Sequence, residues 1–536
     1  MRILLVNPFY PISETPSPPL GLAYLAAALE AAGMEVRVLD LVVRPYSEEL
    51  LAEVLDEFRP GIVGATAVTM TIDAALAVIA DAKRMRPEAV TVVGGPHATF
   101  CAAETLAACP ALDVVALGEG EETVVELARA VRAGAGLHGV RGLAFREAAG
   151  IRVTARRRRI RDLDRLPLPA RHLLPLGRYR ALGMPISMIT SRGCPHRCIF
   201  CVGRRMVGAR VRLRSPQHVV DELEAVAALG FHQVNIADDL FTADAARCAA
   251  VCDEIRRRGL SVRWTAFARV DTVDAALLAR MRQAGCTAVS FGVESGNPGI
   301  LKTARKGITL AQVEAAVRMC AEAGVTALAS FILGLPGETP ETIAETMAFA
   351  RRLEAHGLIY GFHLLAPFPG TRVRERSAEY GLHLLTDDWR RYHANRAVVE
   401  TAAVDRDRLD RIAADWEERF TRYLGEIGER MGQGRATAAE AHQLTNLERI
   451  VLVYDLMMAR TIERVGVWSG TREGALEELV RRVQREFPAK AATAAEALAK
   501  TADRGDLVCE AAGGTVRWRW QDAIEAGGPA AAAASR

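Results

Sequence analysis

The sequence carries almost no net charge. Its 536 residues hold 68 Lys and Arg against 65 Asp and Glu, which leaves a formal charge of +3. A chain so close to neutral has no strong overall field to attract nucleic acid or an anionic membrane. We therefore expect neither as a partner. Lysine itself is scarce, so the positive charge comes almost entirely from arginine.

Long apolar runs are missing as well. No stretch of about eighteen consecutive apolar residues occurs, so we expect no membrane-spanning helix. The apolar start Ile3–Val6 ends at Asn7 and Pro8, which is too short for the core of a secretory signal. These absences predict a soluble, cytoplasmic protein.

Cysteine is too sparse for a disulfide-stabilised secreted scaffold, since only ten are spread over the chain. Most are interpreted as small buried side chains, including Cys248 and Cys252 on one predicted helix. Cys509 carries no signal. The remaining three, Cys194, Cys198 and Cys201, lie together in one short loop.

The first 135 residues alternate short apolar runs with helical patterns. The expected strands are 3–6, 36–39, 62–65, 90–93 and 114–117, and the expected helices are 21–32, 48–58, 74–84 and 121–131. Five strands with intervening helices are typical of a doubly wound parallel sheet.

Glycine and threonine follow several of these strands, at Thr66, Thr69, Gly94, Gly95 and Gly118. Ligands of doubly wound sheets bind at the carboxyl ends of the strands. Any one of these glycines could belong to a tight turn, but their joint position at one sheet edge favours a ligand site.

Residues 138–184 are expected to form a linker. They contain the run Arg156–Arg159 and a proline-punctuated stretch at 166–169. The arginine run lacks interleaved aromatic residues, so we interpret it as a solvated strand or linker and not as a nucleic-acid patch.

From 185 to 395 the alternation returns with a longer period. The expected strands are 186–190, 233–236, 262–266, 288–291, 327–333 and 358–364, and the expected helices are 216–228, 243–257, 274–283, 310–323 and 340–353. Six strand–helix units without a clear seventh predict a partial (β/α)6 barrel of the TIM type. Its chemistry would lie just past the strand ends.

The remaining residues, 396–536, are expected to be helical, with amphipathic stretches at 405–431 and 445–465 and an Ala-rich stretch at 491–500. The end, 527–536, is expected to be a disordered tail. The chain is thus predicted to be an α/β protein with a first domain at 1–137, a linker at 138–184, a barrel at 185–395 and a helical C-terminal domain.

The three clustered cysteines, Cys194, Cys198 and Cys201, form a CxxxCxxC loop directly after the first barrel strand. Three thiolates can hold three irons of a [4Fe–4S] cluster and leave the fourth iron open to a ligand. Structural zinc is the alternative, but it needs four ligands and usually pairs its cysteines as CxxC. His196 lies between two of the cysteines and would strain the loop as a fourth ligand, so the cluster is favoured.

This loop resembles that of the radical S-adenosylmethionine (SAM) superfamily. The resemblance implies that the open iron binds the amino and carboxylate groups of SAM. One electron from the cluster then cleaves SAM to methionine and a 5′-deoxyadenosyl radical, which abstracts hydrogen from a substrate.

The same resemblance implies roles for residues after successive strands. Phe200 matches the aromatic residue near the adenine, and Asp238 and Asp239 match the segment that receives the methionine amino group. Arg269 would pair with the SAM carboxylate.

Two later segments complete the expected SAM site. The stretch 292–296, with Glu294 and Ser295, resembles the ribose-contacting segment, and 331–338, with Gly334, resembles the adenine motif of the fifth strand. Substrate contacts are expected from Tyr360, His363, the turn 367–370 and the C-terminal tail.

An α/β domain ahead of such a barrel resembles the cobalamin-binding domain of the B12-dependent radical SAM class. The resemblance places the cobalamin nucleotide tail against Thr66, Thr69 and Gly94–Gly95, with Gly118 nearby. Many cobalamin proteins carry a cobalt-ligating His after the first strand, but residues 7–21 contain none. His97 is interpreted as a loop histidine that contacts backbone.

The chain is therefore expected to be an enzyme that uses a [4Fe–4S] cluster, SAM and cobalamin to functionalise an unactivated carbon by methyl transfer or oxidative cyclisation. It resembles the anaerobic magnesium-protoporphyrin monomethyl ester cyclase and cobalamin-dependent methyltransferase group. That resemblance implies a small-molecule substrate and an external one-electron reductant of the flavodoxin or ferredoxin type. A radical SAM methylthiotransferase acting on RNA and a non-catalytic cobalamin- or flavin-binding sensor remain as alternatives.

Overall fold

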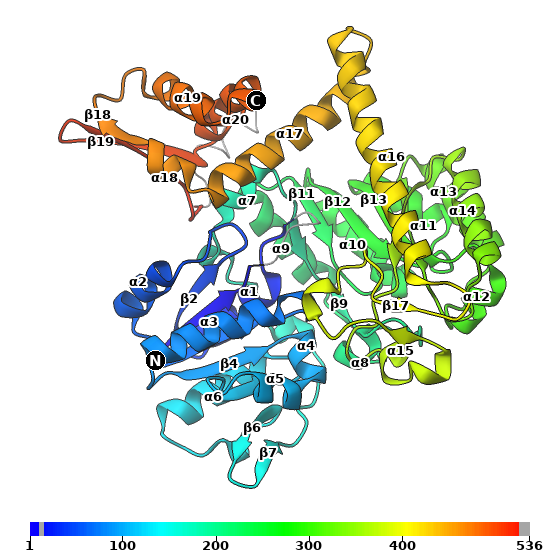
Figure 1. Cartoon of the computed structure of the whole chain (residues 1–536), viewed down its shortest axis with the longest axis horizontal. Coiled ribbons are helices and arrows are strands. Elements are labelled where there is room, and N and C mark those ends of the chain that lie inside the picture. The colour runs from blue at the N-terminus through cyan, green and yellow to red at the C-terminus, as the bar shows by residue number, and fades with distance from the viewer. Residues whose placement is uncertain (10–15, 525–536) are drawn as a thin grey trace.

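The structure, a computed structural model, describes residues 1–9 and 16–524 (Figure 1). The first domain is built on a seven-stranded sheet in the order β2-β1-β3-β4-β5-β6-β7. The strands are β1 (Arg2–Asn7), β2 (Glu35–Asp40), β3 (Ile62–Thr66), β4 (Val90–Gly94), β5 (Val114–Ala116), β6 (Leu143–Glu147) and β7 (Gly150–Val153). The five strands from β1 to β5 pair in parallel.

Both faces of this sheet are covered by helices. The helices are α1 (Leu20–Ala31), α2 (Glu48–Phe58), α3 (Ile72–Met85), α4 (Pro96–Phe100), α5 (Ala102–Ala108) and α6 (Glu121–Arg132). Side chains alternate across β1, so Leu4 and Val6 pack with α2 and α3 while Ile3 and Leu5 pack with α1 and α6. The expected doubly wound sheet is confirmed.

The structure differs from the expected linker at 138–184. Its first part forms β6 and β7, which extend the sheet as an antiparallel hairpin beyond β5. The sequence signal is weak because β7 is exposed along its whole length and only Leu143–Phe145 of β6 are buried. The arginine run 156–159 therefore directly follows an edge strand of the first domain.

The second domain is a curved sheet of six parallel strands in the order β15-β14-β13-β12-β11-β8. The strands are β8 (Ile186–Met188), β11 (Gln233–Ile236), β12 (Arg263–Ala268), β13 (Cys286–Glu294), β14 (Thr326–Leu333) and β15 (Ile359–Leu364). The helices are α9 (Pro216–Ala228), α10 (Ala245–Arg257), α11 (Ala275–Gln283), α12 (Pro298–Thr303), α13 (Leu310–Ala323) and α14 (Pro340–Glu354). The expected partial barrel is confirmed.

Local signals explain why the barrel helices match the expectation. Ser215 caps α9 ahead of Pro216, and Thr309 forms a capping box with Gln312 at the start of α13. Gly324, in the left-handed conformation, ends α13. The helices pack on the outer face of the strands around a core that includes Trp264, Phe291 and Phe331.

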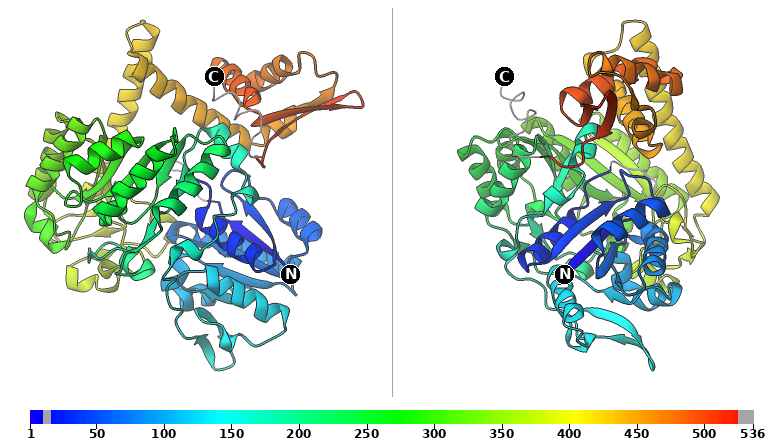
Figure 2. Two further views of the ribbon diagram at one scale, coloured as in Figure 1. Left: turned by 180° about the vertical axis from the view of Figure 1, so that it is seen from behind. Right: turned by 90° about the vertical axis from the view of Figure 1, so that its left-hand side faces the viewer.

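The C-terminal region begins with α16 (Arg406–Gly432) and α17 (Ala438–Met458), which project as a helical hairpin (Figures 1 and 2). It continues with α18 (Thr461–Val465), α19 (Ala475–Glu486) and α20 (Ala491–Asp503). The expected helix at 445–465 is broken at Arg460, which has a positive φ of 51°. Residues 527–536, the expected disordered tail, lie outside the described residues.

The C-terminal region is not purely helical as expected. It also holds a three-stranded antiparallel sheet in the order β18-β20-β19, formed by Val467–Ser469, Thr515–Trp520 and Leu507–Ala512. Gly513 and Gly514, both with positive φ, turn the chain between the last two strands. Leu507, Val516, Trp518 and Trp520 join a core that the helices alone would leave open.

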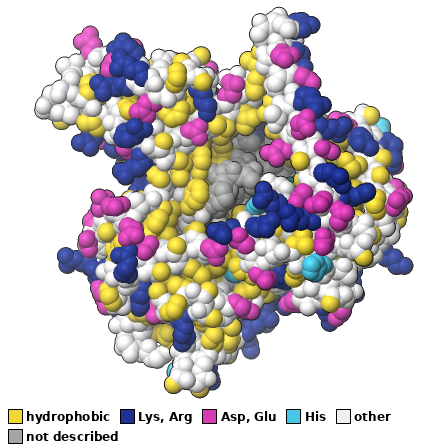
Figure 3. All heavy atoms as spheres, in the orientation of Figure 1, with side chains coloured by type: hydrophobic (Ala, Val, Ile, Leu, Met, Phe, Trp, Pro, Cys, Tyr) yellow, Lys and Arg dark blue, Asp and Glu magenta, His cyan; other side chains and the backbone are white. Residues whose placement is uncertain are grey.

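None of the described helices combines the length and apolar content needed to cross a bilayer. Charged side chains of both signs are interspersed over the face shown in Figure 3, as the near-neutral composition leads one to expect.

Candidate functional site

The cysteine loop is anchored at both ends by a short antiparallel ladder. Strands β9 (Ser191–Arg192) and β10 (Arg212–Leu213) pair on either side of it. Gly193 has a φ of 116°, and a Cβ there would lie 2.4 Å from the carbonyl oxygen of Arg210. Glycine is therefore required at the point where the loop leaves the ladder.

The middle of the loop is also fixed. The N–H of Ile199 donates to the carbonyl of Ala304 at 3.1 Å, and the carbonyl of Ile199 accepts from the N–H of Val373 at 3.1 Å. Ile199 is fully buried. The residue between Cys198 and Phe200 thus holds the loop on the barrel.

All three cysteines of the loop line one cavity of about 310 Å³, together with His196, Arg197 and other residues. Burial raises the pKa of Cys194 and Cys198, and the nearby Arg269 and Lys306 partly offset this. Cys201 is exposed as a residue, yet desolvation of its sulfur raises its pKa to about 11. Thiols held neutral in this way release protons when they bind metal.

This donor set fits an iron–sulfur cluster. Three thiols from one loop share a cavity, and the backbone holds that loop at its ends and centre. The spacing leaves one cluster iron without a cysteine ligand.

Asp238 and Asp239 follow β11 but do different things. Asp238 is buried, and its carboxylate accepts hydrogen bonds from Thr190 N–H at 2.5 Å, Thr190 Oγ1 at 2.6 Å and Ser191 Oγ at 2.6 Å. All of these contacts hold the chain that leads into the cysteine loop. Asp238 is thus engaged in positioning that loop.

Asp239 faces the cysteine loop itself. Its Oδ2 accepts from the N–H of Gly193 at 3.2 Å. A Cβ built at Gly203 would lie 2.8 Å from Asp239 Oδ1 and 3.5 Å from Cys201 Sγ, so the carboxylate and the sulfur flank the same glycine. Burial raises the pKa of Asp239.

Arg269 and Glu294 are both already paired. Arg269 donates to the two carboxylate oxygens of Asp271 at 2.9 and 2.8 Å and to the carbonyl of Lys306 at 2.9 Å. Glu294 has a φ of 73°, which is unusual for a residue with a side chain, and its Oε1 accepts from Lys306 Nζ at 2.7 Å. The sequence did not lead us to expect a role for Lys306, although the scarcity of lysine in this chain could have indicated a functional position.

Ser295 and Gly334 each form hydrogen bonds with other buried residues. Ser295 Oγ lies 3.0 Å from Thr346 Oγ1 of α14 and accepts from the N–H of Asn297. The N–H of Gly334 donates to Glu338 Oε2 at 2.6 Å. Glu338 is almost fully buried, and burial raises its pKa to about 7.

Phe200 is half-buried. It packs against a small apolar cluster that includes Ile199 and Leu335, next to Gly334. The structure therefore brings the aromatic residue of the cysteine loop to the segment after β14.

The carboxyl ends of β3 and β4 approach each other closely in the first domain. Gly95 has a φ of 100°, and a Cβ there would lie 2.6 Å from the carbonyl oxygen of Ala67 and 3.1 Å from Thr66 Oγ1. Thr69 is buried beside them. Gly94 would accept a Cβ at ordinary contact distances.

Gly118, after β5, is held through its N–H, which donates to Thr99 Oγ1 at 3.1 Å. It has a φ of 76°, and a Cβ there would meet no atom within 4 Å. Thr66, Thr69, Gly94, Gly95 and Gly118 thus border one edge of the sheet.

His97 is buried, and its side chain contacts a ring where backbone contact was expected. Its ring lies edge-on to Trp389 with centroids 5.0 Å apart. Burial lowers the pKa of His97 to about 4, so the imidazole is neutral at physiological pH.

Two acids of the segment after β5 connect the first domain to the cysteine loop. Glu119 pairs with Arg212, and Glu121 pairs with Arg192 at 2.5 Å. All four side chains are at least nine-tenths buried. They place the Gly118 edge of the first domain against the strands that carry the cysteine loop.

Comparisons with known proteins agree with this geometry. Residues 13–128 match the B12 binding domain, and residues 188–350 match the radical SAM superfamily. The chain is 37% identical over 400 residues to an uncharacterised methyltransferase of Pyrococcus horikoshii. The aligned region covers 73% of this chain and 86% of that protein. The chain belongs to the B12-binding radical SAM enzymes. It is also 31% identical to the anaerobic magnesium-protoporphyrin IX monomethyl ester cyclase of Rubrivivax gelatinosus, over 78% of this chain and 77% of that one.

Solved structures of such enzymes share the architecture. TsrM from Kitasatospora setae, a radical SAM methyltransferase with cobalamin and a [4Fe–4S] cluster bound, matches with a TM-score of 0.64 and 25% identity over 76% of this chain and 80% of its own. The cobalamin-dependent enzyme OxsB matches over 93% of this chain and 83% of its own, with a TM-score of 0.69 and 17% identity, which shows the common fold.

These matches confirm the expected class. The protein is a radical SAM enzyme that uses a [4Fe–4S] cluster, SAM and cobalamin and functionalises its substrate by methyl transfer or cyclisation. The alternative of an RNA methylthiotransferase is not supported. Enzymes of this superfamily need a source of electrons for the cluster.

Proposed function

We propose that this enzyme transfers a methyl group to an unactivated carbon of a small molecule. The observation that carries the choice of methylation over cyclisation is the 37% identity, over most of both chains, to the uncharacterised methyltransferase of Pyrococcus horikoshii. The buried Arg192–Glu121 and Arg212–Glu119 pairs bring the expected cobalamin edge next to the cysteine loop, which suits either reaction.

In this proposal Cys194, Cys198 and Cys201 hold the cluster. When bound, the cluster and SAM supply a radical that removes a hydrogen atom, and cobalamin supplies a carrier for the methyl group. Asp239 receives the SAM ammonium, because its carboxylate faces the loop and forms no ion pair with the other described residues. Phe200 packs near the adenine, beside the Gly334 segment.

The other residues expected at the SAM site mainly hold the surrounding chain in place. Asp238 holds the start of the cysteine loop through Thr190 and Ser191. Arg269 is fixed by Asp271 close to the cysteines, and Glu294 is held by Lys306 at the end of β13. Ser295 fixes the turn after β13 against α14.

Cobalamin lies along Thr66, Thr69, Gly94, Gly95 and Gly118 in this proposal. Glycine at position 95 lets the chain after β4 lie directly against Ala67 and Thr66 at the end of β3, and this close approach shapes the edge that would hold cobalamin.

The substrate is expected between the two cofactors. Tyr360 and Phe362 share the face of β15 that packs on Trp416 of α16, with ring centroids 5.4 and 5.1 Å apart. His363 therefore lies on the opposite, inward face of the strand. Of the residues expected to meet substrate, His363 and the turn 367–370 remain candidates, whereas Tyr360 belongs to the outer packing.

An external flavodoxin- or ferredoxin-type protein supplies the electron in this proposal. Cys201 is exposed, so a reductant can approach the cluster from the loop side. Arg197 and Arg372 border the same cavity and would suit an acidic partner.

Product analysis tests the reaction type. The protein is purified without oxygen, reconstituted with iron and sulfide, loaded with cobalamin and incubated with reductant, SAM carrying a trideuterated methyl group, and an extract of small molecules. Methylation yields S-adenosylhomocysteine as well as 5′-deoxyadenosine, together with a product heavier by the labelled methyl group. Formation of 5′-deoxyadenosine without S-adenosylhomocysteine would instead establish cyclisation or another hydrogen abstraction.

A further inference from the structure

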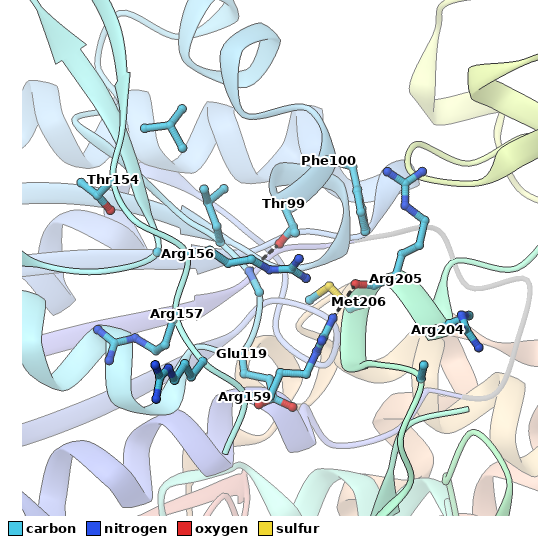
Figure 4. A pocket seen from close by; sticks show the side chains of 16 residues that line it. Thr99, Phe100, Glu119, Thr154, Arg156, Arg157, Arg159, Arg204, Arg205 and Met206 are labelled. Carbon is cyan, nitrogen blue, oxygen red and sulfur yellow. Dashed lines mark hydrogen bonds between the residues drawn. The ribbon is translucent and has the colours of Figure 1, made fainter. Parts of the chain in front are cut away.

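A second cavity, of about 540 Å³, lies between the first domain and helix α8 (Gly203–Val207), which follows the cysteine loop. Six arginines line it: Arg156, Arg157, Arg158, Arg159, Arg204 and Arg205. The first four come from the chain after β7. Figure 4 shows Arg156 and Arg159 extending from that chain across the cavity towards α4 and α8, while Arg204 points away.

Two of the six arginines are neutralised by carboxylates, since Arg157 pairs with Glu126 and Arg205 pairs with Glu375. These pairs leave little of their charge for a ligand. Arg204 donates to the carbonyl of Pro195 and points away from the cavity, so it does not face a ligand there (Figure 4).

The remaining three, Arg156, Arg158 and Arg159, are not neutralised. No carboxylate in the described part of the chain lies within 4.0 Å of the guanidinium of Arg156, Arg158 or Arg159. Arg159 donates only to the carbonyl of Arg205, at 3.1 Å. Glu119, which lines the cavity, already forms an ion pair with Arg212.

Gathering these charges has an energetic cost. Burial lowers the pKa of Arg159, and the neighbouring charges of Arg156 and Arg212 lower it further. Like charges in a partly desolvated site repel, and a bound anion would relieve that repulsion. A guanidinium presents paired N–H donors that match a phosphate or carboxylate.

The cavity also has apolar surface. Phe100, Leu117 and Met206 line it beside the arginines. Phe100 is fixed in place, because it packs directly against Gly370 and under the guanidinium of Arg205. The volume lies in the range of pockets that bind small organic molecules.

We propose that this cavity is a binding site for an organic phosphate, held by Arg156, Arg158 and Arg159 and covered on one side by Phe100 and Met206. The site does not depend on whether the enzyme methylates or cyclises its substrate. Two sources share this chemistry: the phosphate of the cobalamin nucleotide loop, and a separate phosphorylated small molecule.

Calorimetric titration of the full-length protein with inorganic pyrophosphate tests the site. The R156Q/R158Q double variant is expected to weaken binding at least tenfold, because it removes two charge-assisted contacts, and R156K is expected to retain most of the affinity. Both side chains are exposed and make no hydrogen bond or ion pair to the described residues, so folding is not at risk. R152Q is the matched control: Arg152 is exposed on β7, outside the cavity, and its loss should leave binding unchanged.

A second titration separates the two sources by comparing cobalamin with cobinamide, which lacks the nucleotide and its phosphate. If the cavity holds the cobalamin phosphate, R156Q/R158Q weakens cobalamin but not cobinamide, and bound cobalamin blocks pyrophosphate. If the ligand is separate, cobalamin affinity is unchanged and pyrophosphate binds the cobalamin-loaded protein. Wild-type protein that binds no pyrophosphate, together with unchanged cobalamin affinity in the double variant, would overturn the proposal.

Discussion

Arg192 and Glu121 form a buried ion pair that joins the two cofactor domains. Arg192 Nη2 lies 2.5 Å from Glu121 Oε1, and both side chains are at most one-tenth exposed. Arg192 stands two residues before Cys194, and Glu121 begins α6 just after Gly118. The pair therefore couples the position of the cysteine loop to that of the expected cobalamin edge.

Replacing Glu121 with glutamine should loosen this connection. Among the described residues, the nearest carboxylate left to the arginine would be that of Glu119, at 3.7 Å, so we expect a loss of about 1–3 kcal/mol in the free energy of unfolding. Cobalamin affinity should fall as well. Denaturant unfolding and cobalamin titration measure both, and Glu122→Gln, on the exposed side of the same helix turn, is the control. Equal stability of the two variants would mean that the pair contributes nothing.

The Lys306–Glu294 pair offers a second test. Lys306→Met would leave the carboxylate of Glu294 buried without its cation, which typically costs about 3–5 kcal/mol. SAM binding should weaken too, since Glu294 ends the strand that borders the expected ribose. Lys302→Met, at an exposed position on α12, should change neither unfolding nor SAM titration. A Lys306→Met protein with wild-type stability but weak SAM binding would instead assign the lysine directly to the ligand.

Glu338 should make stability depend on pH. Burial raises its pKa from the ordinary 4.5 to about 7 in the folded state, so between these values the folded protein binds more protons than the unfolded chain. Stability contributed by this group is therefore full below about pH 4.5, falls as pH rises, and levels off above about pH 7. The loss is at most about 3 kcal/mol.

Glu338→Gln should flatten this part of the stability profile. An amide oxygen can still accept from the N–H groups of Gly334 and Leu335, so the fold should survive. Urea unfolding at a series of pH values is the measurement. Glu341→Gln, exposed in the first turn of α14, should keep the wild-type slope. Parallel profiles for wild type and Glu338→Gln would show that Glu338 ionises normally.

Removing one thiol of the loop should abolish cluster binding. Cys198→Ala is expected to lose most of its iron after reconstitution and to form no 5′-deoxyadenosine, because the two remaining cysteines cannot hold the cluster. Cys509→Ala changes a thiol far away in β19 and should retain about four irons per chain. Iron analysis and the visible absorption of the cluster report the result. Full iron content in Cys198→Ala would place a ligand elsewhere.

Much of the fold could be predicted from the sequence, because helix caps and apolar spacing depend only on residues close together in the chain. The bounds of α9 and α13 match the expectation residue for residue, since Ser215 and Thr309 cap them and the apolar spacing is helical. The hairpin of β6 and β7 and the sheet of the C-terminal region escaped prediction. Their burial depends on partners elsewhere in the chain, such as the core shared by Trp518 and Leu479.

The candidate site also contains some residues that local patterns identify and others that depend on distant contacts. Cys194, Cys198 and Cys201 could be recognised from spacing alone. The positioning role of Asp238 rests on contacts with Thr190 and Ser191, far away in sequence, which no local pattern records. The sequence indicates a solvated strand or linker at 156–159, and only the three-dimensional placement of α8 and α4 shows that this run lines a cavity.

Gly95→Ala should separate cobalamin binding from the rest of the fold. A methyl group at this position would lie 2.6 Å from the carbonyl oxygen and 2.9 Å from the nitrogen of Ala67, both backbone atoms that cannot rotate away. The positive φ of 100° adds strain of about 1–3 kcal/mol. The loop after β4 must therefore move, and with it the edge where cobalamin is expected.

Cobalamin affinity should fall at least tenfold while iron content stays at about four per chain, because the cysteine loop is anchored by separate contacts. Gly21→Ala, on an exposed helical position with open space around it, should retain both. Wild-type cobalamin affinity in Gly95→Ala would remove the β3–β4 edge from the proposed site.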